Sequence, residues 1–313
     1  MALAAVTGAT GFLGRHLVRA LAEAGFDVRV LMRRDPVHPL WREIEPQVVL
    51  GSLSDPSALE RLCDGADVVI HCAGLIKARN RAEFDAVNRD GAVAVAHAAL
   101  KTAPTARFLL ISSLVAREPQ LSHYAASKRA GEEAAAKLLG DRLTIVRPPA
   151  IYGPGDVETF ALFKAAATAP LLPVFDSAAR IALVHVEDAA DQIVALAKDR
   201  NPGALATLCD ANLAGYSWVD LMSAASEAVG RKPRLVKLPD GVVKLVGMLG
   251  SLAAKGSGVA MLTSEKAREI LHRDWSVSLK EHNPRLPSPR YGLKEGFAQT
   301  VAWYRNNGWL APL

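Results

Sequence analysis

The sequence predicts an α/β fold built on a doubly wound parallel β-sheet, joined to a smaller, mostly helical domain. Three observations support this prediction. Short apolar segments alternate with longer helical segments over roughly the first half of the chain. Segments such as Phe108–Ile111 are continuously apolar, as strands buried on both faces of a sheet must be. A glycine-rich turn joins the first apolar segment to the first helix. Repeated strand–helix–strand units with right-handed crossovers give a sheet that helices cover on both sides.

We expect the strands of this sheet at seven apolar runs. They fall near residues 2–6, 27–32, 47–50, 67–71, 107–111, 142–147 and 205–209. Amphipathic segments of helical length separate them, the first ending at about Ala24. After Pro148 the regular alternation stops, and from about Gly215 the pattern is helical. Because ligands of such sheets bind at the carboxyl ends of the strands, functional residues are expected there.

The turn after the first strand has the spacing Gly-x-x-Gly-x-x-Gly. Glycine lets the backbone approach a pyrophosphate, and the N-terminus of the following helix then binds the phosphates. The spacing differs by one residue from the G-x-G-x-x-G fingerprint, but strand, glycines and helix come in the required order. We expect the cofactor to contact Gly8, Thr10, Gly11, Phe12, Leu13 and Gly14. Residues 1–150 and 187–211 are accordingly assigned to a dinucleotide-binding domain, and residues 151–186 and 212–313 to a substrate domain.

A second pattern, Tyr124-Ala-Ala-Ser-Lys128, begins shortly after the strand that ends in Ser112-Ser113. Residues four apart lie on the same face of a helix. A free tyrosine has a pKa of about 10, and a neighbouring ammonium lowers it toward the range where proton transfer is efficient. The pair therefore suits acid–base chemistry on an alcohol or ketone. Because many helices contain this spacing by chance, the pattern is informative only together with the glycine turn.

The two motifs together resemble the extended branch of the short-chain dehydrogenase/reductase superfamily, and the resemblance covers nearly the whole chain. Further matching segments follow in the family's order at residues 71–74, 88, 147–154, 184–190 and 296–309. The resemblance implies a Rossmann domain with a nicotinamide cofactor. It implies that Ser113 holds a carbonyl oxygen, that Tyr124 donates a proton to it, and that Lys128 lowers the tyrosine pKa and holds the nicotinamide ribose. Ser112 is the alternative to Ser113.

The same resemblance implies further cofactor contacts. These are Ser52, Leu53, Cys72, Ala73, Gly74, Tyr124, Lys128, Pro148 and Ile151. Ser52 stands where the family often has an aspartate.

The second strand bears on the choice between NADP(H) and NAD(H). NAD-binding folds usually place a carboxylate about 20 residues beyond the glycines, where it holds the ribose hydroxyls. That position falls at Met32, which Arg33 and Arg34 follow. Arginine recognises phosphate with a bidentate fork, so a 2′-phosphate is the expected partner. The alternative is a solvated basic turn, partly neutralised by Asp35. We therefore predict NADP(H), with NAD(H) as the second choice.

Two departures from the family pattern concern the substrate. Sugar-nucleotide epimerases of this branch commonly have Asn where this chain has Ala150, and residues 180–185 are more apolar here than in those enzymes. In both respects the chain is similar to the branch of the family that includes 3β-hydroxysteroid dehydrogenases. Segment 240–262 adds apolar residues at helical spacing with lysines around them, too interrupted by charge to cross a bilayer. The segment is either a basic amphipathic helix in peripheral contact with a membrane or an ordinary core-facing helix.

Length, net charge and cysteine spacing argue against a nucleic-acid-binding protein, a metalloprotein and a disulfide-bonded protein. The chain has 313 residues, enough for two domains, and a formal net charge of +5, which suits an anionic cofactor or a membrane surface better than nucleic acid. The three cysteines have neither paired nor metal-ligand spacing, so we expect free thiols in a reducing compartment and no metal.

The first residues already form a strand, so no cleavable signal peptide is expected. We expect a cytoplasmic protein, or one peripheral on the inner face of the membrane.

Three functions remain open. We favour reduction of a ketone on a lipid or other apolar molecule by NADPH, because the pattern is similar to bacterial proteins that reduce the 3-oxo group of sphingoid bases or ceramides. A sugar-nucleotide epimerase or dehydratase with retained NAD is the second, and Ala150 counts against it. The third is a non-catalytic nucleotide-binding subunit similar to the accessory subunit of respiratory complex I. The complete set of Ser113, Tyr124 and Lys128 counts against that function.

Overall fold

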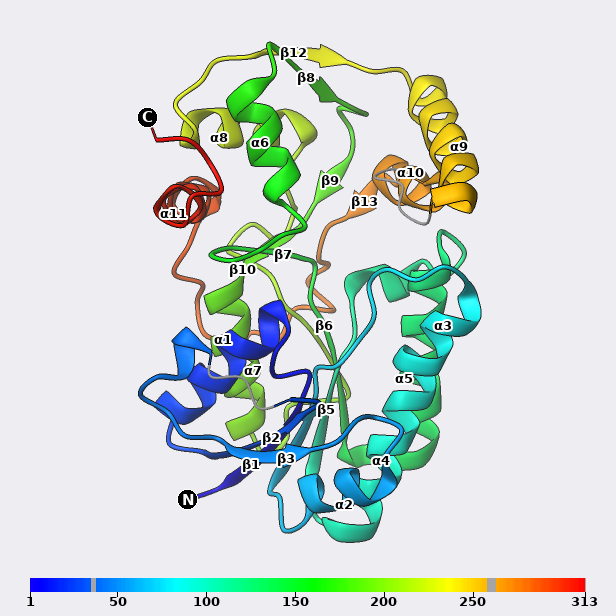
Figure 1. Ribbon diagram of the computed structural model, residues 1–313, viewed down its shortest axis with the longest axis vertical. Coiled ribbons are helices and arrows are strands. Elements are labelled where there is room, and N and C mark those ends of the chain that lie inside the picture. The colour runs from blue at the N-terminus through cyan, green and yellow to red at the C-terminus, as the bar shows by residue number, and fades with distance from the viewer. Residues whose placement is uncertain (35–37, 258–262, 313) are drawn as a thin grey trace. The chain divides into compact units, whose positions relative to one another are not determined.

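The computed structural model describes residues 1–34, 38–257 and 263–312 (Figure 1). The contacts within the chain divide it into two compact units. The first consists of Met1–Pro148, Ala189–Leu208 and Glu281–Pro287, and the second of Pro149–Asp188, Cys209–Lys280 and Ser288–Leu313.

The first unit is built on a seven-stranded sheet in which all strands are parallel. In chain order the strands are β1 (Leu3–Thr7), β2 (Asp27–Met32), β3 (Gln47–Leu50), β4 (Val68–His71), β5 (Arg107–Ile111), β6 (Leu143–Arg147) and β11 (Leu205–Thr207). Their order across the sheet is β11-β6-β5-β4-β1-β2-β3, which reverses direction beside β1. The predicted doubly wound parallel sheet is confirmed. The first six strands begin and end within one residue of the predicted bounds, and β11 is two residues shorter.

Helices cover both faces of this sheet (Figure 1). They are α1 (Phe12–Glu23), α2 (Pro56–Cys63), α3 (Arg81–Asp85), α4 (Gly91–Thr102), α5 (His123–Leu139) and α7 (Val186–Lys198). α2, α4 and α5 pack beside one another on one face, and α1 and α7 lie on the other. Alanines such as Ala92, Ala96 and Ala99 of α4 are fully or almost fully buried, which lets this helix approach the sheet closely.

Short helical turns complete the first unit. They are η1 (Pro39–Trp41), η3 (Leu114–Arg117) and η4 (Gly140–Arg142), together with the π-helix η2 (Ala86–Asp90) directly before α4. π-Helical turns inside helices often occur at functional sites. Asn88 lies at the centre of this one and is buried.

The second unit is mostly helical, as predicted. Its helices are α6 (Phe160–Thr168), α8 (Trp218–Ala228), α9 (Asp240–Ser257), α10 (Ser264–Leu271) and α11 (Leu293–Asn306). Their core is aromatic: the rings of Tyr152, Phe163, Phe297 and Tyr304 pack edge to face or tilted, with centroids 4.9–5.6 Å apart. Such pairs add directional stabilisation to the burial of apolar area.

The second unit also contains three two-stranded parallel sheets, which the sequence analysis did not predict. They pair β7 (Ala150–Tyr152) with β10 (Leu183–His185), β8 (Leu171–Val174) with β12 (Arg234–Lys237), and β9 (Arg180–Ile181) with β13 (Asp274–Trp275). Each strand has only two to four residues. Runs this short carry too little periodicity to distinguish a strand from a loop.

The segment Glu281–Pro287 belongs to the first unit, whereas the sequence analysis assigned all of 212–313 to the substrate domain. The amide of Thr207 donates to the carbonyl of Glu281 over 3.2 Å. Arg285 forms an ion pair with Asp199 at the end of α7, with 2.9 Å between nitrogen and oxygen. These contacts join the segment to the edge of the main sheet. In the described part of the chain no helix is long and apolar enough to span a bilayer.

Candidate active site

The glycine turn between β1 and α1 is packed too tightly for side chains. Gly8 has a φ of +73°, and a Cβ atom there would lie 2.5 Å from the amide nitrogen of Ala73. A Cβ atom at Gly14 would lie 2.0 Å from the carbonyl oxygen of Gly8. Gly11 is the N-cap residue of α1 and makes no side-chain hydrogen bond to the first-turn amides. This cradle fits a pyrophosphate, because bare backbone amides at a helix N-terminus attract anions.

The end of β4 lies beside this turn. The amide of Cys72 donates to the carbonyl of Thr7 over 3.2 Å, and the amide of Ala73 donates to the Thr7 hydroxyl over 3.3 Å. The same hydroxyl is 2.7 Å from Nδ1 of His71. Burial, together with the charge of Lys128, lowers the pKa of His71 to about 3. His71 is therefore neutral at physiological pH and fixes the end of β4 to the end of β1.

α5 brings Tyr124 and Lys128 to the carboxyl ends of the strands. The helix begins after Ser122, whose hydroxyl accepts the amide of Ala125 over 3.0 Å. Lys128 is buried, and its Nζ donates to the carbonyl of Ile111 at the end of β5 over 2.7 Å. Burial lowers the pKa of Lys128 to about 8, although Cys72 and Glu132 act in the opposite direction. Tyr124 is only partly buried.

The two serines after β5 have different environments. The hydroxyl of Ser112 is buried and donates to Oε1 of Glu132 over 2.5 Å. Ser113 is partly exposed, and its hydroxyl accepts the amide of Val115 over 3.4 Å at the start of η3. Ser112 is thus committed to a structural contact, whereas the hydroxyl hydrogen of Ser113 can be donated to a substrate. This arrangement favours Ser113 over Ser112 as the functional serine.

Glu132 also forms a buried, bidentate ion pair with Arg147. Nε of Arg147 is 2.9 Å from one carboxylate oxygen, and Nη2 is 2.6 Å from the other. The hydrogen bonds to Glu132 raise the pKa of Arg147 further. Glu132 is not among the site residues predicted from the sequence. Its position, four residues after Lys128 on the same helix face, is the signal that would have identified it.

Asn88 ties the π-helix to α5 and to the loop after β4. Its Oδ1 accepts the amide of Leu75 over 2.8 Å, and its Nδ2 donates to the Leu75 carbonyl and to Oγ of Ser127. A Cβ atom at Gly74 would lie 3.3 Å from Oδ1 of Asn88 and 3.5 Å from Nζ of Lys128. The chain therefore passes close to the lysine at Gly74, and a side chain there would crowd it.

Basic residues follow the glycine turn and β2. Arg33 and Arg34 are both exposed directly after β2. Arg15, in the first turn of α1, acts with burial to lower the pKa of His38, so these two side chains are near each other. Arg15 is not among the residues predicted from the sequence, although it directly follows the last glycine of the motif. Asp35, which it considered a counter-charge, lies outside the described residues.

The remaining predicted cofactor residues lie in the turn before α2, after β6 and in β7. The hydroxyl of Ser52 is 2.9 Å from that of Ser54 in the turn before α2, and Leu53 packs against the core under that turn. The carbonyl of Pro148 accepts the amide of Leu114 over 2.8 Å, which holds the loop after Ser113. Ile151 lies in β7 of the second unit.

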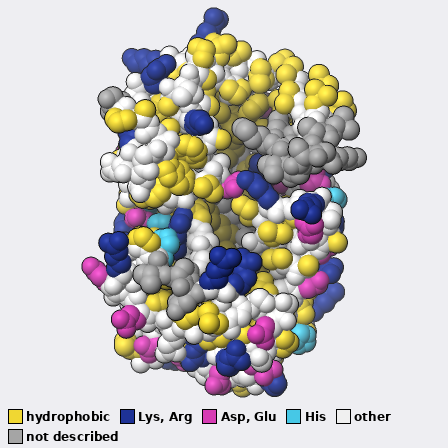
Figure 2. All heavy atoms as spheres, viewed as in Figure 1, with side chains coloured by type: hydrophobic (Ala, Val, Ile, Leu, Met, Phe, Trp, Pro, Cys, Tyr) yellow, Lys and Arg dark blue, Asp and Glu magenta, His cyan; other side chains and the backbone are white. Residues whose placement is uncertain are grey.

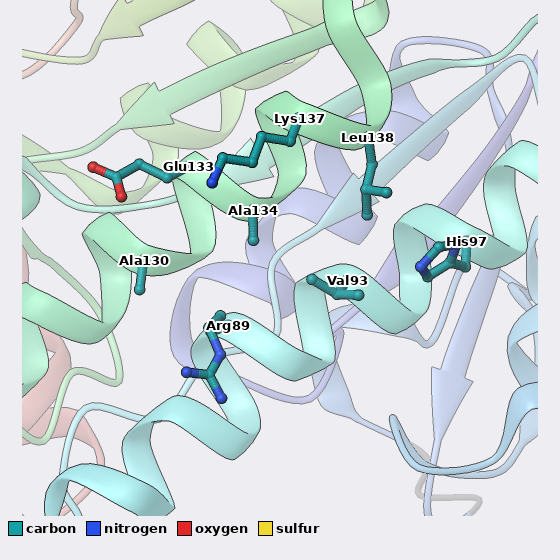
Figure 3. A pocket seen from close by; sticks show the side chains of 8 residues that line it. All are labelled: Arg89, Val93, His97, Ala130, Glu133, Ala134, Lys137 and Leu138. Carbon is teal, nitrogen blue, oxygen red and sulfur yellow. The ribbon is translucent and has the colours of Figure 1, made fainter.

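A surface groove of about 440 Å³ lies between α4 and α5 and is separate from this site (Figure 3). It is lined by Arg89, Val93, His97, Ala130, Glu133, Ala134, Lys137 and Leu138. The helix period places Glu133, at the centre of its α5 residues, on the opposite side of that helix from Tyr124.

Comparison with known proteins identifies a family whose match includes the glycine turn and the strands of the main sheet. Residues 4–206 match the description NAD dependent epimerase/dehydratase family. The chain belongs to this family. This membership confirms the resemblance to extended short-chain dehydrogenases/reductases and identifies the chain as an NAD(P)-dependent enzyme.

Two curated proteins and one solved structure are similar to this chain. A ceramide reductase of Caulobacter vibrioides (strain NA1000 / CB15N) is 52% identical over 307 residues, which cover 98% of this chain and 95% of that protein. The 4-hydroxy-2-methyl-3-oxo-4-farnesyl-3,4-dihydroquinoline-1-oxide ketoreductase of Stigmatella aurantiaca is 33% identical over 170 residues, 48% of this chain and 51% of that one. The crystal structure of gox2253 has a TM-score of 0.78 at 23% identity, covers 99% of both chains, and shows the shared fold.

Proposed function

We propose that the protein is an NADP(H)-dependent ketoreductase that reduces a ketone on a lipid to a secondary alcohol. The substrate we propose is the 3-oxo group of a sphingoid base or ceramide. The observation that carries this proposal is the 52% identity to a ceramide reductase along nearly the whole chain. In the proposed division of labour, residues 1–150 and 187–211 bind the dinucleotide, and residues 151–186 and 212–313 contribute the substrate region.

Ser113, Tyr124 and Lys128 perform the proposed chemistry. When bound, the reduced nicotinamide supplies a hydride to the carbonyl carbon. Ser113 donates a hydrogen bond to the carbonyl oxygen, and Tyr124 transfers its phenolic proton to the same oxygen, which completes the alcohol. Lys128, fixed by the carbonyl of Ile111, stabilises the phenolate that remains. The hydride and the proton together account for the two hydrogens gained.

NADP(H) is the proposed cofactor because positive charge is available where a 2′-phosphate would bind. Arg33 and Arg34 are exposed at the end of β2, and Arg15 lies in the first turn of α1. The chain has no carboxylate at position 32, where NAD-specific folds usually hold the ribose hydroxyls. We place the reaction in the cytoplasm, because it consumes NADPH and because no disulfide joins Cys63, Cys72 and Cys209.

The proposal is tested by offering the purified protein NADPH with long-chain 3-oxo sphingoid bases or 3-oxoceramides in detergent micelles, and sugar nucleotides in parallel. We expect NADPH oxidation with the lipids alone, and oxidation slower by about 10²–10⁴ with the Tyr124→Phe variant. Conversion of a sugar nucleotide without net cofactor consumption, and no oxidation with the lipids, would replace the proposed reaction with that of an epimerase. Binding of cofactor without turnover of either class would instead support a nucleotide-binding subunit.

A further inference from the structure

The inner side of α9 is fixed by its packing against α10. Val243 is buried, and a Cβ atom at Gly247 would lie 2.8 Å from Cβ of Ala267. One turn further along, the hydroxyl of Ser251 accepts the amide of Ser264 over 2.7 Å. These three positions are four residues apart, so they form one line along the helix. The opposite side of α9 is therefore turned away from α10.

That outer side is apolar and exposed. Its members, called the α9 face below, are Val242, Leu245, Val246, Met248 and Leu249, with 43–55% of each residue exposed. Among the described residues no other helix exposes more than one large hydrophobic side chain. Figure 2 shows apolar side chains gathered at the upper right, where Figure 1 draws α9. A contiguous apolar surface of this kind marks an interaction site.

The exposure bears on one of the two interpretations of segment 240–262, that of an ordinary core-facing helix. A core-facing helix would bury Val242, Leu245, Val246 and Leu249, and all four are exposed. The core interpretation is therefore wrong for these positions. The side chain of Leu252 and residues 258–262 lie outside the part of the chain that the structure describes.

The residues before and within α9 are basic. Arg231, Lys232, Arg234 and Lys237, in and before β12, are all exposed, as is Lys244 on α9 itself. The only acidic residue between positions 231 and 250 is Asp240. Asp176, whose pKa Lys237 helps to lower, is already paired with Arg273 at 2.6 Å. Segment 231–250, which includes the α9 face, thus carries a strong excess of positive charge along the chain.

We propose that the α9 face docks the protein on the surface of a membrane rich in anionic phospholipids. An amphipathic helix with an apolar face and flanking lysines or arginines lies in the membrane interface, and anionic head groups strengthen its binding. The charge excess favours this occupant over a second copy of the chain, because two copies would bring their basic segments together. Docking goes beyond the proposed reaction and does not require it, although it would bring the enzyme to substrates that reside in membranes.

The test is flotation of the full-length protein with vesicles of phosphatidylcholine alone and of phosphatidylcholine with phosphatidylglycerol, without cofactor or substrate. We expect flotation with the anionic vesicles and much less with the neutral ones. The double variant Leu245→Ser with Leu249→Ser should weaken binding to anionic vesicles by roughly tenfold or more. Lys232→Glu with Lys237→Glu should abolish the preference for anionic vesicles.

Two matched controls separate docking from a general loss of surface hydrophobicity. Val219→Ser removes a valine that is 43% exposed on α8, as Val242 is on α9, and Leu279→Ser removes a leucine that is 82% exposed. Both controls should float like the unaltered protein, and circular dichroism should show that every variant is folded. Equal flotation of the α9 variants and the controls would overturn the proposal. So would concentration-dependent self-association that the α9 double variant removes while vesicle binding is absent, because the face would then join two copies.

Turnover is measured separately with detergent-solubilised substrate, where docking is not needed. If the unaltered protein does not float with anionic vesicles but turns over normally, the docking proposal alone is defeated. Normal flotation without turnover of any 3-oxo lipid defeats the proposed reaction alone.

Discussion

Glu132 and Arg147 form a bidentate ion pair that joins the middle of α5 to the last residue of β6. Both side chains are at least nine-tenths buried, and the hydroxyl of Ser112 donates to the same carboxylate. The pair therefore connects the helix that carries Tyr124 and Lys128 to the ends of two strands.

Removing one member of this pair should destabilise the protein strongly. Glu132→Ala leaves the guanidinium of Arg147 buried without its partner, which costs about 3–5 kcal/mol in such cases. The next residue supplies the control: Glu133 pairs with Arg129 on the exposed side of α5 at 2.8 Å, and Glu133→Ala should cost less than about 1 kcal/mol. Unfolding in urea measures both free energies. Similar losses in the two variants would contradict the structural role of Glu132.

The two serines after β5 should separate stability from catalysis. Ser112→Ala removes a hydrogen bond to a buried carboxylate and should lower the free energy of unfolding by about 1.5–3 kcal/mol while kcat changes little. Ser113→Ala should lower kcat by roughly 10² because it removes a donor to the substrate oxygen, and it should leave stability nearly unchanged. Urea unfolding and steady-state kinetics are measured on both variants. The reverse pattern would assign the catalytic role to Ser112.

Tyr124→Phe removes only the phenolic hydroxyl of the proposed proton donor. We expect kcat to fall by about 10²–10⁴, the usual contribution of general acid catalysis, while the Kd for the cofactor stays within a few-fold. Cofactor fluorescence titration and stopped-assay turnover measure the two quantities. Activity close to that of the unaltered protein would exclude Tyr124 from the mechanism.

Arg33→Ala combined with Arg34→Ala should discriminate between the cofactors. Loss of charged hydrogen bonds to a 2′-phosphate should weaken NADPH binding by roughly 10²-fold and change NADH binding little. Arg19→Ala is the control, because Arg19 is exposed on α1 and paired with Glu23. Equal losses for NADPH and NADH in the double variant would remove the basis for assigning NADP(H).

Lys128 should make stability depend on pH in the alkaline range. In the folded protein its pKa falls from 10.5 to about 8, so between these values the unfolded chain binds a proton that the folded chain has lost. The free energy of unfolding then rises with pH across this window. The contribution is complete above the unfolded pKa and disappears as pH falls through about 8.

The variant Lys128→Met lacks this titration and isolates its effect from that of other groups. The difference in unfolding free energy between the original protein and the variant should increase from about pH 7 to about pH 10, measured by urea unfolding without cofactor. A difference that does not change with pH would show that Lys128 titrates normally in the folded state.

The sequence predicted the main sheet well because its strands are buried on both faces. Runs such as Val68–His71 in β4 are fully buried, and continuous apolar runs identify such strands without information about their neighbours. β8 and β12 could not be found in this way. Each has four residues, and they pair across about 60 residues of intervening chain, so only the folded structure shows that they are strands.

The candidate site was predicted where residue type and spacing define the chemistry, as at the glycine turn and at Tyr124 and Lys128. The roles of these residues remain predictions. Glu132 was missed because a glutamate in an amphipathic helix is usually exposed, and its partner Arg147 is fifteen residues away. The choice between Ser112 and Ser113 also required the folded position of Glu132, because it shows that the Ser112 hydroxyl is bound to the Glu132 carboxylate.

The spacing of contacts along α5 has a consequence for how this chain can vary in evolution. Ser127 contacts Asn88, Lys128 contacts Ile111, and Glu132 contacts Arg147, all from one side of the helix. Inserting or deleting a single residue within this stretch would rotate the later positions by roughly 100° relative to the earlier ones. Active homologues should therefore show no gaps between positions 124 and 132, whereas the solvent-facing pair of Arg129 and Glu133 is free to diverge.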